Sequence, residues 1–104
     1  MDTNDVTTLR KLCKAKKKRR DKLLEDKRIQ KLIREVAYNL LDGRIHLTAN
    51  RKKYLMRKAS DVRKLAKKST SHRNRLRITQ QRGGFLSAIL LPALATLASS
   101  LFKR

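Results

Sequence analysis

The chain has 104 residues and a formal net charge of +21, with 29 Lys and Arg residues against eight Asp and Glu. This length allows one small domain at most, and the charge repels the chain itself while attracting any dense polyanion. A single cysteine, Cys13, excludes an internal disulfide and a metal site built from several cysteines. The composition therefore favours a small protein that binds nucleic acid or another polyanion.

The charge is distributed very unevenly along the chain. Up to Arg82 there are 27 Lys and Arg residues against all eight acidic residues, so this part carries a net charge of +19. Residues 83–102 carry no charge. We divide the chain into four expected parts: a basic arm (1–28), an amphipathic helical hairpin (29–68), a basic segment (69–82), and a Gly-Gly joint with an apolar C-terminal helix (83–104).

The amino-terminal part is expected to be a basic arm. Residues 1–8 are polar and form either a disordered leader or a cap, and no apolar stretch follows them, so we expect no secretory signal peptide. Residues 9–27 contain no Gly or Pro and are rich in helix-forming residues, which predicts one helix. Its like charges repel one another, so we expect it to be partly disordered when free. Neighbouring lysines are expected to lower the pKa of Cys13, although an incidental small residue is the simpler interpretation.

Residues 29–67 carry the pattern of a helical hairpin. Apolar residues in its first helix repeat on one face, and Gly43 predicts the end of that helix because glycine readily adopts the left-handed conformation. Thr48 is a typical N-cap for the second helix. Ile45 and Leu47, between the helices, are expected to cover the open end of the hairpin. The apolar face of the first helix comprises Ile29, Leu32, Ile33, Val36, Ala37, Leu40 and Leu41.

A weakly apolar helical stretch is expected up to Gln81, and the uncharged segment 85–102 follows Gly83-Gly84. At about 1.5 Å per residue this segment is about 27 Å long as a helix, the short limit for crossing a bilayer. Pro92 is expected to kink it. Membrane insertion or disruption is our first interpretation, packing inside an assembly the second, and a core helix of the same chain the third, since few polar residues interrupt its apolar surface.

The basic residues predict binding to double-stranded DNA without sequence specificity. Neutralising many phosphates at once releases condensed counterions and gives strong, salt-sensitive affinity. Arg holds phosphate through two hydrogen bonds, so the arginines of residues 73–82 are expected to be the strongest single contacts. The predicted DNA-binding residues are Lys16, Lys17, Lys18, Arg19, Arg20, Arg51, Lys52, Lys53, Lys67, Lys68, Arg73, Arg75, Arg77 and Arg82.

Catalytic chemistry finds no support in the sequence. His46 and His72 have no Cys or Asp pattern around them that would build a metal site or a nucleophilic triad. Gly83-Gly84 is not a phosphate-binding loop, because no strand precedes it and no Gly-Lys-Ser/Thr follows. We therefore expect a non-enzymatic protein without catalytic residues, cofactor or metal.

The order of these features resembles a known group of viral proteins. Residues 73–94 (Arg-Asn-Arg-Leu-Arg-Ile-Thr-Gln-Gln-Arg-Gly-Gly-Phe-Leu-Ser-Ala-Ile-Leu-Leu-Pro-Ala-Leu) resemble the precursors of the adenovirus mu core peptide, with an arginine-rich segment, Gly-Gly and an apolar tail. Residues 32–91 resemble the small basic proteins of the Polinton (Maverick) and adintovirus group. The motifs that carry this second resemblance lie at residues 39–43, 45–48, 63–69 and 83–86.

The resemblance implies a virion core protein that condenses double-stranded DNA and is packaged with it, in the virion and, during assembly, in the host nucleus. It implies capsid proteins and a viral cysteine protease as partners. In adenoviruses that protease cuts such precursors after Gly-Gly, which here marks Gly83, Gly84 and Phe85 as the processing site. The alternative is a membrane-active (lytic) or capsid-cementing minor virion protein that contacts membrane through residues 85–102.

Overall fold

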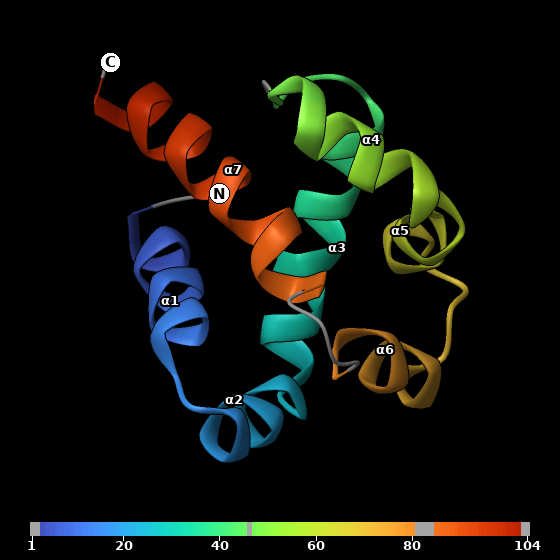
Figure 1. The fold of residues 1–104 in the computed structure, drawn as a ribbon. Coiled ribbons are helices and arrows are strands. Elements are labelled where there is room, and N and C mark those ends of the chain that lie inside the picture. The colour runs from blue at the N-terminus through green and yellow to red at the C-terminus, as the bar shows by residue number, and fades with distance from the viewer. Residues whose placement is uncertain (1–2, 46, 81–84, 103–104) are drawn as a thin grey trace.

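The chain folds into helices alone over the part that the structure describes. The computed structural model covers residues 3–45, 47–80 and 85–102 in this description, with side chains for 4–45, 47–80 and 85–95. These residues form seven α-helices and no strand (Figure 1), so the expected all-α class is confirmed. The helices are α1 (Thr3–Lys14), α2 (Lys17–Leu24), α3 (Lys27–Leu41), α4 (Ala49–Arg57), α5 (Ala59–Ala66), α6 (His72–Thr79) and α7 (Phe85–Phe102).

The central helix is α3, which contacts α1, α2, α5, α6 and α7. Its buried face matches the expected apolar face except at Leu41, which is 41% exposed, and at Gln30, a polar residue that is also buried. The most extensive contact of α3 is with α5, so the two amphipathic helices lie together as a hairpin requires. Ile45 is buried and Leu47 is partly buried against the core at the open end of this pair. Burial of these apolar faces is the main contribution to the stability of the fold.

Hydrogen bonds at the helix ends confirm two predicted boundaries. The backbone N–H groups of Gly43 and Arg44 donate to the carbonyls of Leu40 and Asn39, at 3.3 and 3.1 Å. This is the Schellman arrangement, and Gly43 adopts the positive φ of 73° that it requires. At the start of α4, the Thr48 hydroxyl accepts a hydrogen bond from the backbone N–H of Arg51 at 3.4 Å. The sequence therefore places the turn between α3 and α4 correctly.

Two expected helices are each divided. The single helix expected over residues 9–27 is α1 and α2, and α1 already begins at Thr3, so a leader over residues 3–8 is wrong. Val6, Leu9 and Leu12 of α1 are buried, whereas α2 buries only Leu24. The apolar residues hold α1 on the core, and a break lets the basic α2 turn away from it. The second hairpin helix is likewise divided at Lys58 into α4 and α5.

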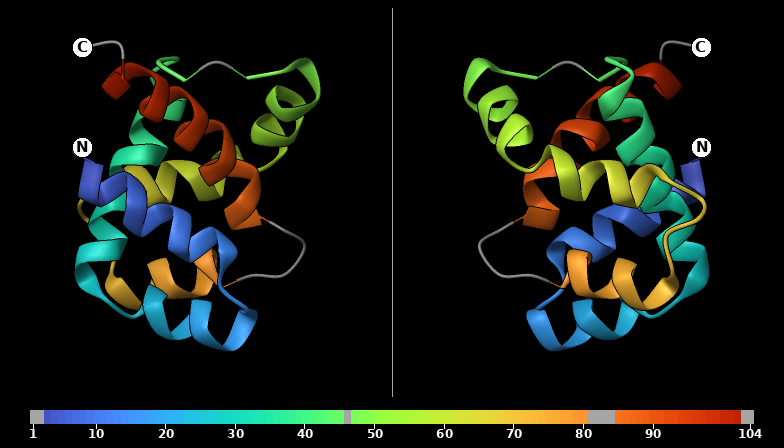
Figure 2. Two further views of the ribbon diagram at one scale, coloured as in Figure 1. Left: turned by 90° about the vertical axis from the view of Figure 1, so that its left-hand side faces the viewer. Right: turned by 90° about the vertical axis from the view of Figure 1, so that its right-hand side faces the viewer.

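The apolar helix α7 is part of the core, which corrects the prediction of a separate C-terminal helix. It packs against α1 and α3, and Figure 2 shows it side by side with α1. It runs through Pro92 as a continuous helix. Of the three interpretations of this segment, a core helix of the same chain is the one that applies to residues 85–94. The apolar faces of α1 and α3 provide the surface against which this part of α7 is buried. The buried apolar side chains of α7 are Phe85, Leu86, Ile89, Leu90, Ala93 and Leu94.

Candidate nucleic-acid interface

Most of the predicted DNA-binding side chains lie on the surface of the protein. Arg20 is half-buried and Arg75 is buried, and Arg82 lies outside the described residues. The core takes the apolar side chains, so the long cationic ones extend into solvent, where phosphate can reach them. The exposed members of the predicted set are Lys16, Lys17, Lys18, Arg19, Arg51, Lys52, Lys53, Lys67, Lys68, Arg73 and Arg77.

The exposed members of the predicted set lie mainly at two ends of the molecule. Helices α2 and α6 lie together at one end, and α4 lies at the other (Figures 1 and 2). The Gln80 side chain, at the end of α6, donates a hydrogen bond to the backbone carbonyl of Asp21 in α2 at 3.1 Å, which joins the two helices. We call residues 16–20 with Arg73 and Arg77 the α2/α6 end, and Arg51–Lys53 the α4 end. The longest dimension of the molecule is 36 Å.

The α4 end is held only loosely to the rest of the fold. Helix α4 has no buried residue and contacts mainly α5, and Figure 2 shows it at the periphery. Met56 is 72% exposed. The Arg57 guanidinium lies over the Tyr54 ring, 5.8 Å from its centroid, a cation–π contact that helps to order this short helix. Because α4 packs so little against the rest of the protein, nearly all its basic side chains are free to contact a partner.

The carboxylates neutralise little of the surface charge. Lys17 Nζ lies 2.8 Å from Asp21 Oδ2, four residues away on α2. Arg28 Nη2 lies 3.8 Å from Asp5 Oδ1, which ties α3 to α1. The cations of both pairs are largely exposed, so each pair is worth about 1 kcal/mol or less and a phosphate can compete for the cation. The α2/α6 end therefore keeps its basic character despite Asp21.

Arg75 has a structural position, which corrects its prediction as a phosphate contact of the outer surface. It is 6% exposed, and its Nε donates to the Thr70 carbonyl at 3.2 Å. Its two terminal nitrogens donate to the carbonyls of Leu65, at 2.6 Å, and Lys67. Burial, and secondly the charge of Arg34, lower the pKa of Arg75. The guanidinium thus satisfies carbonyls that the end of α5 leaves unpaired and fixes the connection to α6.

Cys13 does not have the reactive environment that its basic neighbours suggest. The side chain is partly buried against the core, between the apolar residues of α1 and its partners. Burial raises the pKa of the thiol, and the nearby charge of Arg20 opposes this only in part. The prediction of a lowered pKa is therefore wrong, because the loss of hydration exceeds the electrostatic attraction.

The expected processing site is only partly within the described residues. Gly83 and Gly84 lie outside them, and Phe85 is the first residue of α7 with a fully buried side chain. A protease binds several residues on both sides of the bond it cuts. Cleavage at Gly84–Phe85 in the folded protein would therefore require Phe85 to leave the core.

Three basic side chains on the polar face of α3 were not among the binding residues predicted from the sequence. Lys27, Lys31 and Arg34 are spaced four and three residues apart, which places them on one helix face. This spacing could have identified them as a basic cluster. Residues 29–67 were interpreted from their apolar face alone, as a helical hairpin, so the polar face of the first helix was not considered. They lie beside Lys68 and Arg75, around a pocket that is described below.

Comparisons with known proteins gave no match. No protein-family model, curated protein or solved structure matches the chain. Within residues 3–45, 47–80 and 85–102, no group of three or more His, Cys, Asp or Glu side chains is suited to hold a metal ion. In the same part of the chain, no helix combines the length and the hydropathy needed to cross a membrane. The proposal for function therefore depends on charge and geometry.

Proposed function

We propose that this protein is a non-enzymatic DNA-binding protein that condenses double-stranded DNA without sequence specificity. The observation that carries the proposal is the pair of basic ends on one small folded body. A protein with a single basic face coats one duplex. A protein with basic groups at opposite ends can contact two duplex segments at once and draw them together.

The magnitude of the charge supports this reading. Duplex DNA carries two charges per base pair and rises about 3.4 Å per base pair, so a net charge of +21 matches about 10 base pairs, or about 34 Å of duplex. The longest dimension of the protein is 36 Å. One molecule therefore carries about the charge of the length of duplex that it spans, as charge neutralisation during condensation requires.

Salt dependence of DNA affinity tests the binding itself. We expect the affinity of the intact chain for a 20-base-pair duplex, measured by fluorescence anisotropy, to fall steeply as salt rises. With at least six phosphate contacts the slope of log K against log salt is about −5 or steeper. Duplexes of different sequence should bind within about twofold of each other. A flat salt response, or a strong preference for one sequence, would contradict the proposal.

A matched pair of variants tests the two-ended arrangement. Arg51→Gln/Lys52→Gln/Lys53→Gln removes three charges from the α4 end and leaves Arg57 as the one basic residue of α4. The control, Lys18→Gln/Arg19→Gln/Arg73→Gln, removes three charges but leaves Lys16, Lys17, Arg20 and Arg77 at the α2/α6 end. Light scattering of DNA mixtures should show condensation lost in the first variant and largely kept in the control. Equal loss in both would mean that total charge alone drives condensation.

The resemblance to adenovirus-type core proteins extends the proposal to a viral genome packaged in the nucleus and carried in the virion. Capsid proteins would then meet exposed residues of α7 such as Leu91, which is 48% exposed. The membrane-active alternative requires the buried side chains of residues 85–94 to leave the core. Dye release from anionic liposomes at neutral pH separates the two, since the DNA-condensing role predicts none.

A further inference from the structure

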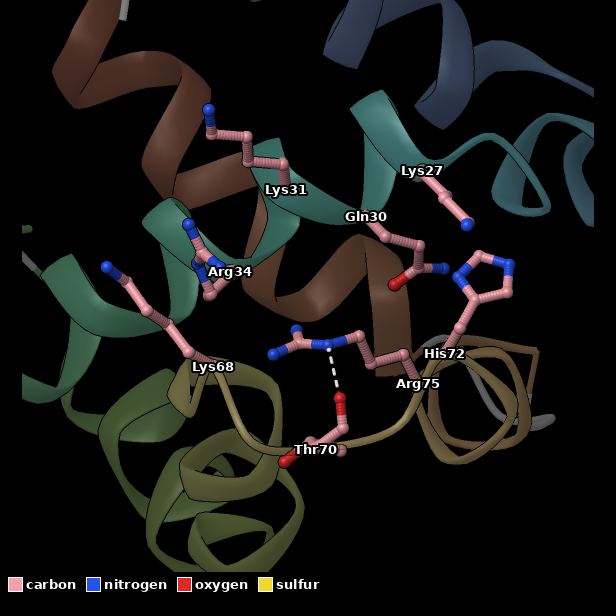
Figure 3. A pocket seen from close by; sticks show the side chains of 8 residues that line it. All are labelled: Lys27, Gln30, Lys31, Arg34, Lys68, Thr70, His72 and Arg75. Carbon is pink, nitrogen blue, oxygen red and sulfur yellow. Dashed lines mark hydrogen bonds between the residues drawn. The ribbon is translucent and has the colours of Figure 1, made fainter.

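A pocket lies between α3, the α5–α6 connection and the start of α6, and its lining is strongly basic. Its volume is about 430 Å³, within the range of small-molecule sites. Among the described residues that line it none carries a carboxylate. The lining side chains, shown in Figure 3, are those of Lys27, Gln30, Lys31, Arg34, Lys68, Thr70, His72 and Arg75.

The lining residues carry five like charges around this small volume. In Figure 3 the side chain of Arg34 lies beside the pocket, while Lys31 and Lys68 extend their amino groups away from its centre. Burial, and secondly the charge of Arg34, lower the pKa of Arg75, in keeping with the position of both guanidinium groups around the same pocket. Such crowding raises the free energy of the folded state unless an anion neutralises it. The flexible lysine stems allow their amino groups to turn inward onto such an anion.

Gln30 adds a second, independent feature. Its side chain is 3% exposed, and its Nε2 donates to the Leu24 carbonyl at 2.8 Å and to the Thr79 hydroxyl at 3.2 Å. The Leu24 carbonyl can only accept, so the amide nitrogen must face it and the oxygen must face the other way. That oxygen, Oε1, is buried without a hydrogen-bond partner in the described part of the chain, and it points into the pocket in Figure 3.

An unpaired buried acceptor costs about 1–3 kcal/mol, so a ligand that donates to Gln30 Oε1 gains from satisfying it. Phosphate esters that are fully ionised supply acceptors for the cations but no such donor. Arg75 has used one N–H of each terminal nitrogen on backbone carbonyls, and the second N–H of each remains for a ligand. The lining therefore combines several hydrogen-bond donors suited to an anion with one buried hydrogen-bond acceptor.

We infer that this pocket binds a compact ligand that carries several phosphates and at least one hydroxyl group. Inositol phosphates and nucleoside triphosphates both have this chemistry, with phosphates for the cationic side chains and a hydroxyl for Gln30 Oε1. The DNA backbone lacks the hydroxyl, so this site is separate from the phosphate contacts of the two basic ends and does not depend on them.

Calorimetric titration of the intact chain at about 0.3 M salt, where the Debye length is short and the outer surface is screened, tests the inference. The probes are inositol trisphosphate, ATP and tripolyphosphate. We expect one saturable site that prefers a hydroxylated probe to tripolyphosphate by at least about fivefold, and the tighter of the first two identifies the source. Equal binding of all three, or no saturable site, would overturn the inference.

Two double variants test whether the ligand binds in this pocket. Lys31→Gln/Arg34→Gln should weaken binding of the preferred probe at least tenfold, whereas Arg51→Gln/Lys52→Gln, with the same change of charge on α4, should weaken it less than twofold. Equal weakening by both pairs would show diffuse attraction and overturn the assignment. The Arg51 and Lys52 pair should reduce DNA affinity more than the Lys31 and Arg34 pair, because the proposed DNA contacts include the α4 end and not the pocket. Failure of this site and failure of the DNA-binding proposal therefore give different results. Circular dichroism verifies that each variant is folded.

Discussion

Helices α7 and α4 differ in both composition and burial. The first half of α7 is uncharged and buried against α1 and α3, whereas α4 is basic and buries no residue. The apolar helix therefore contributes to stability, and the basic helix is available for the proposed contact with DNA. The lesson is that an uncharged C-terminal segment on a polycation can be the element that lets the polycation fold.

Shortening a buried side chain of α7 should give the largest loss of stability. Leu90 is fully buried, so Leu90→Ala removes apolar contacts and leaves a cavity, at a cost of about 2–5 kcal/mol in the free energy of unfolding. Leu91→Ala is the control, because Leu91 is 48% exposed on the same helix and should cost less than about 1 kcal/mol. Urea denaturation followed by circular dichroism measures both, and equal effects would mean that α7 is not a core helix.

Two arginines of α6 should differ in the same way within one helix. Arg75→Gln leaves carbonyls at the end of α5 without a charged donor and should cost about 2–4 kcal/mol of stability. Arg77→Gln changes an exposed side chain, so it should leave the free energy of unfolding within about 0.5 kcal/mol. Thermal denaturation compares the two. A larger loss in Arg77→Gln would contradict the structural role given to Arg75.

Removing charge from α4 should change DNA binding without changing stability. In Arg51→Gln/Lys52→Gln/Lys53→Gln, the slope of log K against log salt should become shallower by up to about 3, if each residue contacts one phosphate. The melting temperature should stay within a few degrees, because α4 has no buried side chain to lose. An unchanged slope would show that the α4 end does not meet DNA.

The smallest effect concerns the thiol of α1. Burial raises the pKa of Cys13, so less thiolate is present near pH 8 than for a free cysteine, and alkylation by iodoacetamide should be several-fold slower in the folded protein than in urea. The rate in the folded state should continue to rise with pH above the ordinary cysteine range. A faster reaction in the folded protein would mean that the lysines around Cys13 outweigh its burial.

The parts of the fold that follow local rules could be predicted from the sequence. The helical period in residues 29–40, the left-handed glycine at Gly43 and the cap at Thr48 are all local signals, and they gave the central helix and its turn. The breaks at residues 15–16 and at Lys58 carry no Gly or Pro. They arise because buried residues such as Leu9 and Val62 must face a common core, which only the tertiary structure defines.

The burial of α7 and of Arg75 could not be predicted for a different reason. An apolar helix without a polar face suits lipid and protein equally, so the sequence of residues 85–94 does not say what covers it. Arg75 has arginines two residues before and after it, and it differs from them by its hydrogen bonds to the carbonyls of Leu65 and Lys67, which only the tertiary structure brings near it. The exposure of most predicted basic residues follows from the solvation of charge and does not require knowledge of the fold, whereas their contact with DNA stays a prediction.

Amide hydrogen exchange of the intact, DNA-free protein, followed by NMR, tests most directly the claim that the apolar helix stabilises the folded polycation. Amides of α7 at residues 89–91, 93 and 94 should exchange about as slowly as those of the buried face of α3, since both should open only when the whole fold opens. Those of α4 should exchange far faster. Rapid exchange in α7 while α3 remains protected would contradict the account, because the helix would then not belong to the folded core.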